Sequence, residues 1–129
     1  MKRAPPLGRL TYLYVGTSDF DADLAYYRDV IGAEVVWNLT GFGARVAAFR
    51  VSEGPLYLIA DHRHAPNVMP VFAVDDLDKT EKALRKRGWT SEGERFEIPD
   101  GPALLFKDRS GNELAVYGDE RPGALQREE

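Results

Sequence analysis

The chain carries an internal repeat, and this feature restricts its possible folds more than any other. The stretch DFDADLAYYRDVIG, which begins at Asp19, is echoed by DLDKTEKALRKRG, which begins 57 positions later at Asp76. Few residues are identical, but the spacing of the apolar positions and the bounding Asp and Gly residues recur. A chain built from two copies of one unit is expected to fold as two similar modules.

The first copy predicts a strand, a helix and three more strands. Leu10 to Val15 is a short apolar and aromatic run, which is typical of a strand. Asp19 is the expected N-cap of a helix that ends at Gly32. Strand-like runs follow at 34–38, 45–51 and 56–60, separated by the turn sequences GFG and SEGP. Module one, about 10–60, therefore has the predicted order βαβββ.

A linker at 61–67 leads into a second copy of the same order. A strand is predicted at 71–74, and Asp75-Asp76 offers a cap for a helix that Gly88 ends. Strand-like runs recur at 89–91, 95–98, 103–106 and 114–117. Module two thus spans about 68–118, a tail occupies 119–129, and the whole chain 1–129 is expected to form a single domain.

The repeat also predicts how the modules are buried. One helix covers only one face of a four-stranded sheet, so the uncovered faces must meet within the chain or across a dimer. The predicted class is α+β, with two tandem βαβββ modules forming curved mixed sheets around a cavity. A ligand is expected in that cavity.

Composition excludes several classes of function. The 129 residues carry a formal net charge of −4, which argues against nucleic-acid binding, and the absence of cysteine excludes disulfides and thiolate chemistry. No apolar stretch approaches the roughly 18 residues that span a bilayer, so no membrane partner is expected. The N-terminal sequence MKRAPPLGRL lacks the apolar core of a signal peptide, so we expect a cytoplasmic protein.

Three segments together resemble a known family. They are DADLAYYRDVIGAEVV, VFAVDDLDKTEKALRKRG and the closing segment FKDRSGNELAVY. In this order and spacing they are similar to the vicinal oxygen chelate superfamily, which includes glyoxalase I, extradiol dioxygenases, fosfomycin-resistance enzymes and bleomycin-resistance proteins. The resemblance spans about 10–118 and implies the glyoxalase/bleomycin-resistance fold.

The resemblance also implies where a metal would bind. Metal-dependent members use four strand positions, two in each module, which usually carry His, Glu or Gln. The matching positions here are Ala115, Met69, either Tyr12 or Leu10, and a residue within 56–60. A methyl group has no lone pair, and a thioether is a soft donor suited to copper(I) rather than to magnesium, manganese or zinc. We therefore expect no metal and no other cofactor.

The two histidines of the chain, His62 and His64, lie two residues apart in the linker. Loops are usually exposed, so both histidines are predicted to be solvated surface side chains. A metal-ligand role or an acid–base role stays open, since imidazole titrates near neutral pH.

Strand alternation predicts which side chains face the cavity. If Leu13 and Val15 pack under the first helix, Tyr12 and Tyr14 face the other way. By the same rule, residues 72, 74, 114 and 116 of the second module are predicted to face its helix. The predicted ligand-binding residues are Tyr12, Tyr14, Trp37, Phe49, Tyr57, Met69, Ala115 and Tyr117. The alternative is that these rings fill the space themselves or form a dimer contact. Arg45 and Arg50 have opposite parity, so at most one of them faces the cavity.

These observations favour a metal-independent small-molecule-binding protein that sequesters a largely apolar or aromatic ligand and acts as a homodimer. One alternative is a lyase, isomerase or dioxygenase-like enzyme with a non-standard metal site that uses His62 or His64. Another is a module whose cavity is closed by its own side chains and which serves only in dimerisation or partner binding. No catalytic residue is assigned.

Overall fold

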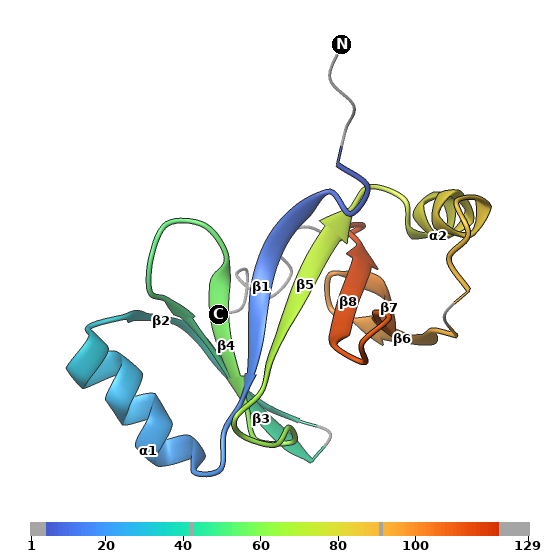
Figure 1. Ribbon diagram of the computed structural model, residues 1–129. Helices are drawn as coiled ribbons and strands as arrows, with labels where there is room; N and C mark the ends of the chain where they lie inside the picture. The colour runs from blue at the N-terminus through green and yellow to red at the C-terminus, as the bar shows by residue number, and fades with distance from the viewer. Residues whose placement is uncertain (1–4, 42, 91, 122–129) are drawn as a thin grey trace. The chain divides into compact units, whose positions relative to one another are not determined.

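The computed structural model describes residues 5–41, 43–90 and 92–121 (Figure 1). The chain divides into two compact units, of which one is Thr11–Met69 and the other joins the residues before Thr11 to those from Pro70 onward. Each unit holds one copy of the predicted βαβββ order, so the α+β class with two tandem modules is confirmed. Among the described residues, no helix has the length and apolar character needed to cross a membrane.

Module one forms a four-stranded mixed sheet. Its elements are β1 (Arg9–Gly16), α1 (Phe20–Ala25), η1 (Tyr26–Ile31), β2 (Glu34–Gly41), β3 (Ala44–Arg50) and β4 (Leu56–Ala60). The strand order is β2-β3-β4-β1. Strands β1 and β4 are parallel, and the other two pairs are antiparallel.

The helical part of module one begins and ends where the sequence predicts, but its second half is wound differently. The Asp19 carboxylate accepts the N–H of Ala22 at 3.1 Å, and Gly32 closes the segment with φ of 83°. Residues 26–31 form a π-helix instead of continuing the α-helix. A π turn advances each residue by a smaller angle than an α turn. Val30 and Ile31, the last two residues of this π-helix, are 70% and 49% exposed.

The core of module one lies between its helical segments and one face of its sheet. Phe49 and Ile59 of the sheet are fully buried there against Phe20. The ring of Tyr27 lies 5.3 Å from that of Phe49 and 5.1 Å from that of Tyr57. We call this side of the sheet the helix-covered face.

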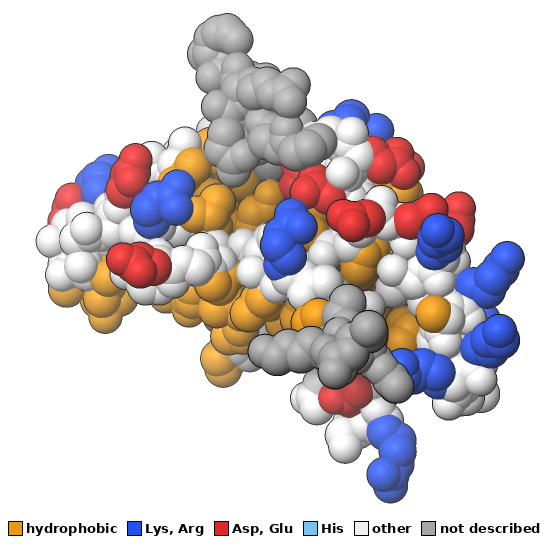
Figure 2. All heavy atoms as spheres, turned by 90° about the horizontal axis from the view of Figure 1, so that it is seen from above, with side chains coloured by type: hydrophobic (Ala, Val, Ile, Leu, Met, Phe, Trp, Pro, Cys, Tyr) orange, Lys and Arg blue, Asp and Glu red, His pale blue; other side chains and the backbone are white. Residues whose placement is uncertain are grey.

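Module two repeats the arrangement with one α-helix. Its elements are β5 (Val68–Val74), α2 (Leu77–Lys86), β6 (Glu94–Ile98), β7 (Gly101–Lys107) and β8 (Glu113–Gly118), with strand order β5-β8-β7-β6. The Asp76 carboxylate caps α2 by accepting the N–H of Lys79 at 3.1 Å. Figure 2 shows Lys and Arg side chains gathered where α2 lies, with carboxylates among them, as expected for the solvated side of an amphipathic helix.

The strand predicted at 89–91 is wrong for its first two residues, and Ser91 lies outside the described residues. The N–H of Trp89 donates to the carbonyl of Leu84 at 3.0 Å, so this backbone closes the helix instead of joining a sheet. The Trp89 ring meets Phe106 edge-on, with 5.2 Å between ring centroids. The predicted alternation in β5 and β8 is confirmed, because the α2-side core contains Phe72, Val74, Leu114 and Val116.

Candidate functional site

The other face of the module-one sheet carries three of the six predicted aromatic residues, Tyr12, Tyr14 and Trp37. In the strand registers Trp37 pairs with Ala48, Ala48 with Leu58, and Leu58 with Tyr14. Paired residues of adjacent strands point to the same side, so these four form one row across the sheet. The helical segments pack on the opposite side, around Phe49. We call the face that carries this row the helix-free face of module one.

Trp37 occupies the end of the row on the edge strand β2. Its side chain is almost fully buried, with 8% exposure. Its indole Nε1–H is also buried and has no hydrogen-bond acceptor among the described residues. A buried donor without an acceptor costs about 1–3 kcal/mol, so such groups are few in native proteins.

Tyr14 occupies the other end of the row and is bonded to the linker. Its hydroxyl lies 3.2 Å from Nε2 of His62, and the two rings are tilted at 55°. Burial raises the pKa of Tyr14 to about 12; the Arg63 guanidinium opposes this rise and the Asp61 carboxylate adds to it. Tyr14 is therefore a neutral hydroxyl near neutral pH, able both to donate and to accept a hydrogen bond.

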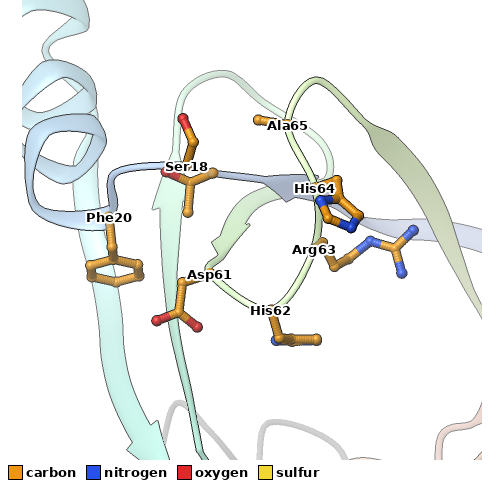
Figure 3. Close-up of a pocket in the computed structure, with 8 residues that line it drawn as sticks. Ser18, Phe20, Asp61, His62, Arg63, His64 and Ala65 are labelled. Atoms are coloured by element: carbon orange, nitrogen blue, oxygen red, sulfur yellow. The ribbon is translucent and has the colours of Figure 1, made fainter.

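The linker and the β1–α1 loop enclose a pocket of about 440 Å³. Figure 3 shows Phe20 and Asp61 on one side of this region, with Arg63 and His64 on the other. The complete lining is Thr17, Ser18, Phe20, Asp61, His62, Arg63, His64 and Ala65. We call this space the loop pocket.

Gly16 allows the linker to lie against β1. A Cβ atom added at Gly16 would lie 2.1 Å from the carbonyl oxygen of His64, closer than any real contact. The N–H of Gly16 donates to Asn67 at 3.0 Å, and that of Thr17 donates to Ala60 at 3.2 Å. These bonds hold both ends of the linker, so the walls of the loop pocket are fixed by backbone contacts.

The structure divides the predicted ligand-binding residues among three surfaces. Tyr12, Tyr14 and Trp37 share the helix-free face of module one. Phe49 and Tyr57, predicted beside them, lie instead on the helix-covered face, because the register pairs them with Val35 and Leu13 rather than with the Trp37 row. In module two, the remaining three alternate with the helix-facing residues and are buried: Met69, Ala115 and Tyr117.

The two arginines considered as ligand contacts are both ion-paired at the surface. Arg45 lies 3.0 Å from Asp21 and stacks over the ring of Phe20 at 4.1 Å, on the helix-covered face. Arg50 has the opposite parity and lies 3.5 Å from Glu34 on the neighbouring strand.

Sequence reasoning missed the loop pocket. His62 and His64 are exposed, as predicted for a linker, but both line the pocket, and His62 is bonded to Tyr14. Asp61 and Arg63 were not singled out. The available signal was the sequence DHRH at 61–64, because it places four charged or titratable side chains next to one another in one short loop.

The positions at which the resemblance places the family's metal ligands do not fit a metal. They carry Tyr12 or Leu10, Met69 and Ala115, and the helix-free side of β4 presents Leu56, Leu58 and Ala60. None of these is a carboxylate, an imidazole or an amide, the donors that hard and borderline divalent ions require. Across the part of the chain that the structure describes, no three His, Cys, Asp or Glu side chains cluster closely enough to bind a metal.

Known proteins share this fold. The crystal structure of methylmalonyl-CoA epimerase from Mycobacterium tuberculosis matches with a TM-score of 0.72 and 17% identity, over 91% of each chain. The hypothetical protein BH1468 from Bacillus halodurans C-125 matches at 0.69 with 8% identity, over 83% of this chain and 91% of its own. The 2,3-dioxygenase LapB from Pseudomonas sp. KL28 matches at 0.67 with 18% identity, over 88% of this chain and 41% of LapB. At these identities the likeness establishes the fold alone.

Sequence comparison identifies the family. No curated protein matches the chain significantly. The family model described as Glyoxalase/Bleomycin resistance protein/Dioxygenase superfamily matches residues 9–116, which is most of the sequence. The resemblance found in the three sequence segments is thereby confirmed, and the chain belongs to the Glyoxalase/Bleomycin resistance protein/Dioxygenase superfamily.

Proposed function

We propose that the protein is a metal-independent small-molecule-binding protein that holds a largely apolar or aromatic ligand on the helix-free face of module one. The observation that carries this proposal is the buried indole N–H of Trp37, which has no acceptor among the described residues. An acceptor atom of a bound molecule would satisfy this donor and remove the cost of leaving it unpaired.

The row that starts at Trp37 favours a ligand of a particular chemistry. Its middle members, Ala48 and Leu58, are apolar, so a flat molecule lying along the row would contact hydrocarbon side chains. Its far end is the Tyr14 hydroxyl, three strand spacings away, or about 14 Å along the sheet. A molecule of two or three fused rings with a hydrogen-bond acceptor at one end matches this row. Stacking on tyrosine would add about 0.5–1.5 kcal/mol for each ring pair.

Metal independence is supported by the side chains at the family's ligand positions, which lack hard donors. Homodimer formation is proposed from the family resemblance. The exposed apolar side chains of Tyr26, Val30 and Ile31 on η1 offer a surface for it.

An enzyme is the second candidate, and the pair formed by Tyr14 and His62 favours it. A hydroxyl hydrogen-bonded to an imidazole can pass a proton to or from a bound molecule. Structural relatives include an epimerase and a dioxygenase. Metal analysis of protein purified without chelator separates the candidates, because stoichiometric zinc, manganese or iron held by His62 or His64 would support an enzyme with a non-standard metal site.

The binding proposal is tested with Nile red, a neutral fused-ring probe with a carbonyl acceptor. The chain has two tryptophans, so Trp37→Phe removes the proposed donor, and Trp89→Phe, on the α2 side of module two, is a matched control. We expect Trp37→Phe to weaken Nile red binding about tenfold, equivalent to about 1.4 kcal/mol, and Trp89→Phe to leave it unchanged. Equal affinity of the wild type and Trp37→Phe would overturn the proposed site.

Chelation tests metal independence in the same assay. Because no step of the proposed binding uses a metal, EDTA treatment is expected to leave the Nile red affinity and the melting temperature unchanged. A loss of both that added zinc or manganese restores would contradict the proposal.

A further inference from the structure

We propose that the loop pocket of module one is an oxyanion site, separate from the apolar row, that binds a carboxylate or a phosphate-like group. Its lining combines one guanidinium, two imidazoles and a serine hydroxyl within a single cavity of about 440 Å³: Arg63, His62, His64 and Ser18. Each of these groups can donate a hydrogen bond to an anionic oxygen, and bonds of this charge-assisted kind are the stronger class.

The lining combines charged groups with neutral hydrogen-bond donors. Arg63 and Asp61 carry charges of opposite sign. The two imidazoles and the serine hydroxyl add ring N–H and O–H groups that can donate to an anionic oxygen.

The Asp61 carboxylate carries a negative charge, but it lies on the opposite side of the pocket from Arg63 and His64 (Figure 3). Its Oδ1 accepts the backbone N–H of Arg45 at 2.9 Å. The other charged or titratable groups nearby are also engaged: Asp23 with the Thr17 hydroxyl, Asp21 with the Arg45 guanidinium, and Tyr14 with His62. Among the lining residues, Ser18, Asp61, His62, His64 and Ala65 are exposed, so the imidazoles and the serine hydroxyl are accessible to a ligand.

The backbone of the pocket is organised before a ligand arrives. The linker is bonded to β1 through Gly16, and the Arg63 guanidinium donates to the Asn67 side chain at 2.9 Å. The same guanidinium lies 5.8 Å from the Tyr14 ring centroid. A planar guanidinium with five donors can keep the Asn67 bond while it binds an anion. Little conformational entropy would then be lost on binding.

The test uses the histidine side chains as reporters. The chain has two histidines and both line the pocket, so every imidazole resonance in an NMR spectrum comes from this site. Single variants, His62→Gln and His64→Gln, assign the two signals. Titrations use sodium sulfate, whose charge is constant across neutral pH, and sodium acetate, each against sodium chloride at equal ionic strength.

We expect saturable shifts of both imidazole signals with sulfate or acetate. Arg63→Gln and His64→Gln should each weaken binding about fivefold or more. Arg109→Gln makes the same charge change in the β7–β8 turn and should have less than a twofold effect. Stronger binding of sulfate indicates a phosphate-like ligand, and stronger binding of acetate indicates a carboxylate.

Two results would overturn the oxyanion site. One is a chloride titration that reproduces the shifts, because the shifts would then reflect ionic screening and not specific binding of an oxyanion. The other is a sulfate affinity that the variants at Arg63 and His64 leave unchanged. Neither result bears on Nile red, which is uncharged, so failure here is distinguishable from failure of the apolar site.

Discussion

The hydroxyl of Tyr14 lies 3.2 Å from Nε2 of His62, although the two residues are 48 positions apart. This bond joins the apolar row of module one to the loop pocket, because Tyr14 ends the row and His62 lines the pocket. A ligand in either of the two proposed sites would therefore contact one partner of the same pair.

The Tyr14–His62 bond should show as a coupling energy. Tyr14→Phe and His62→Gln each break it, so in a double-mutant cycle we expect a coupling of about 0.5–1 kcal/mol in the free energy of unfolding by urea. The value is small because the bond is partly exposed. Tyr26→Phe combined with His62→Gln is the control and should couple by about zero. Equal couplings in the two cycles would mean that the bond contributes nothing to stability.

Tyr14 should ionise later than an ordinary tyrosine. Burial raises its pKa from 10.0 to about 12. Between these values the unfolded state releases a proton that the folded state keeps, so this group's contribution to stability is present below about pH 10 and is lost as the pH rises towards 12. Ultraviolet titration of phenolate formation, compared between the wild type and Tyr14→Phe, should show one late-ionising group missing from the variant. Loss of a group that titrates near pH 10 would contradict the assignment.

Gly16→Ala should be clearly destabilising. Its new methyl group would overlap the carbonyl of His64, and neither backbone can move without breaking the bonds that hold the linker. We expect a loss of about 1–3 kcal/mol in the free energy of unfolding, together with weaker anion binding. Gly41→Ala is the matched control, since Gly41 is also in a strand but no atom of the described residues beyond its chain neighbours lies within 4 Å of the added methyl. Equal losses of unfolding free energy in the two variants would show that the short distance between Gly16 and the His64 carbonyl does not exclude a side chain at position 16.

The N-cap of α2 can be tested with two neighbouring aspartates. Asp76→Ala removes the carboxylate that accepts the Lys79 N–H and should cost about 1 kcal/mol in the free energy of unfolding. Asp75→Ala removes the same charge one residue earlier and should cost less than about 0.5 kcal/mol. If the two variants melt at the same temperature, local charge rather than capping accounts for the effect.

The sequence alone determined the repeat, its two βαβββ modules and the ends of most elements. These features are local: Asp19 and Asp76 cap the helices through their own side chains, and Gly32 adopts a left-handed conformation that other residues avoid. Alternation also predicted correctly that Leu114 and Val116 face the helix in module two. The family followed from three segments in order. The absence of hard donors at the metal positions that the resemblance implies stays a prediction.

Tertiary structure decided the rest, because it depends on pairings between distant residues. Alternation states which residues of one strand share a face, but the register with other strands decides which face a helix covers. For this reason Phe49 and Tyr57, predicted to share a face with Trp37 and Tyr14, lie on the helix-covered face instead. The loop pocket exists because Gly16 lets a distant linker lie against β1, and no local pattern in the chain encodes that contact.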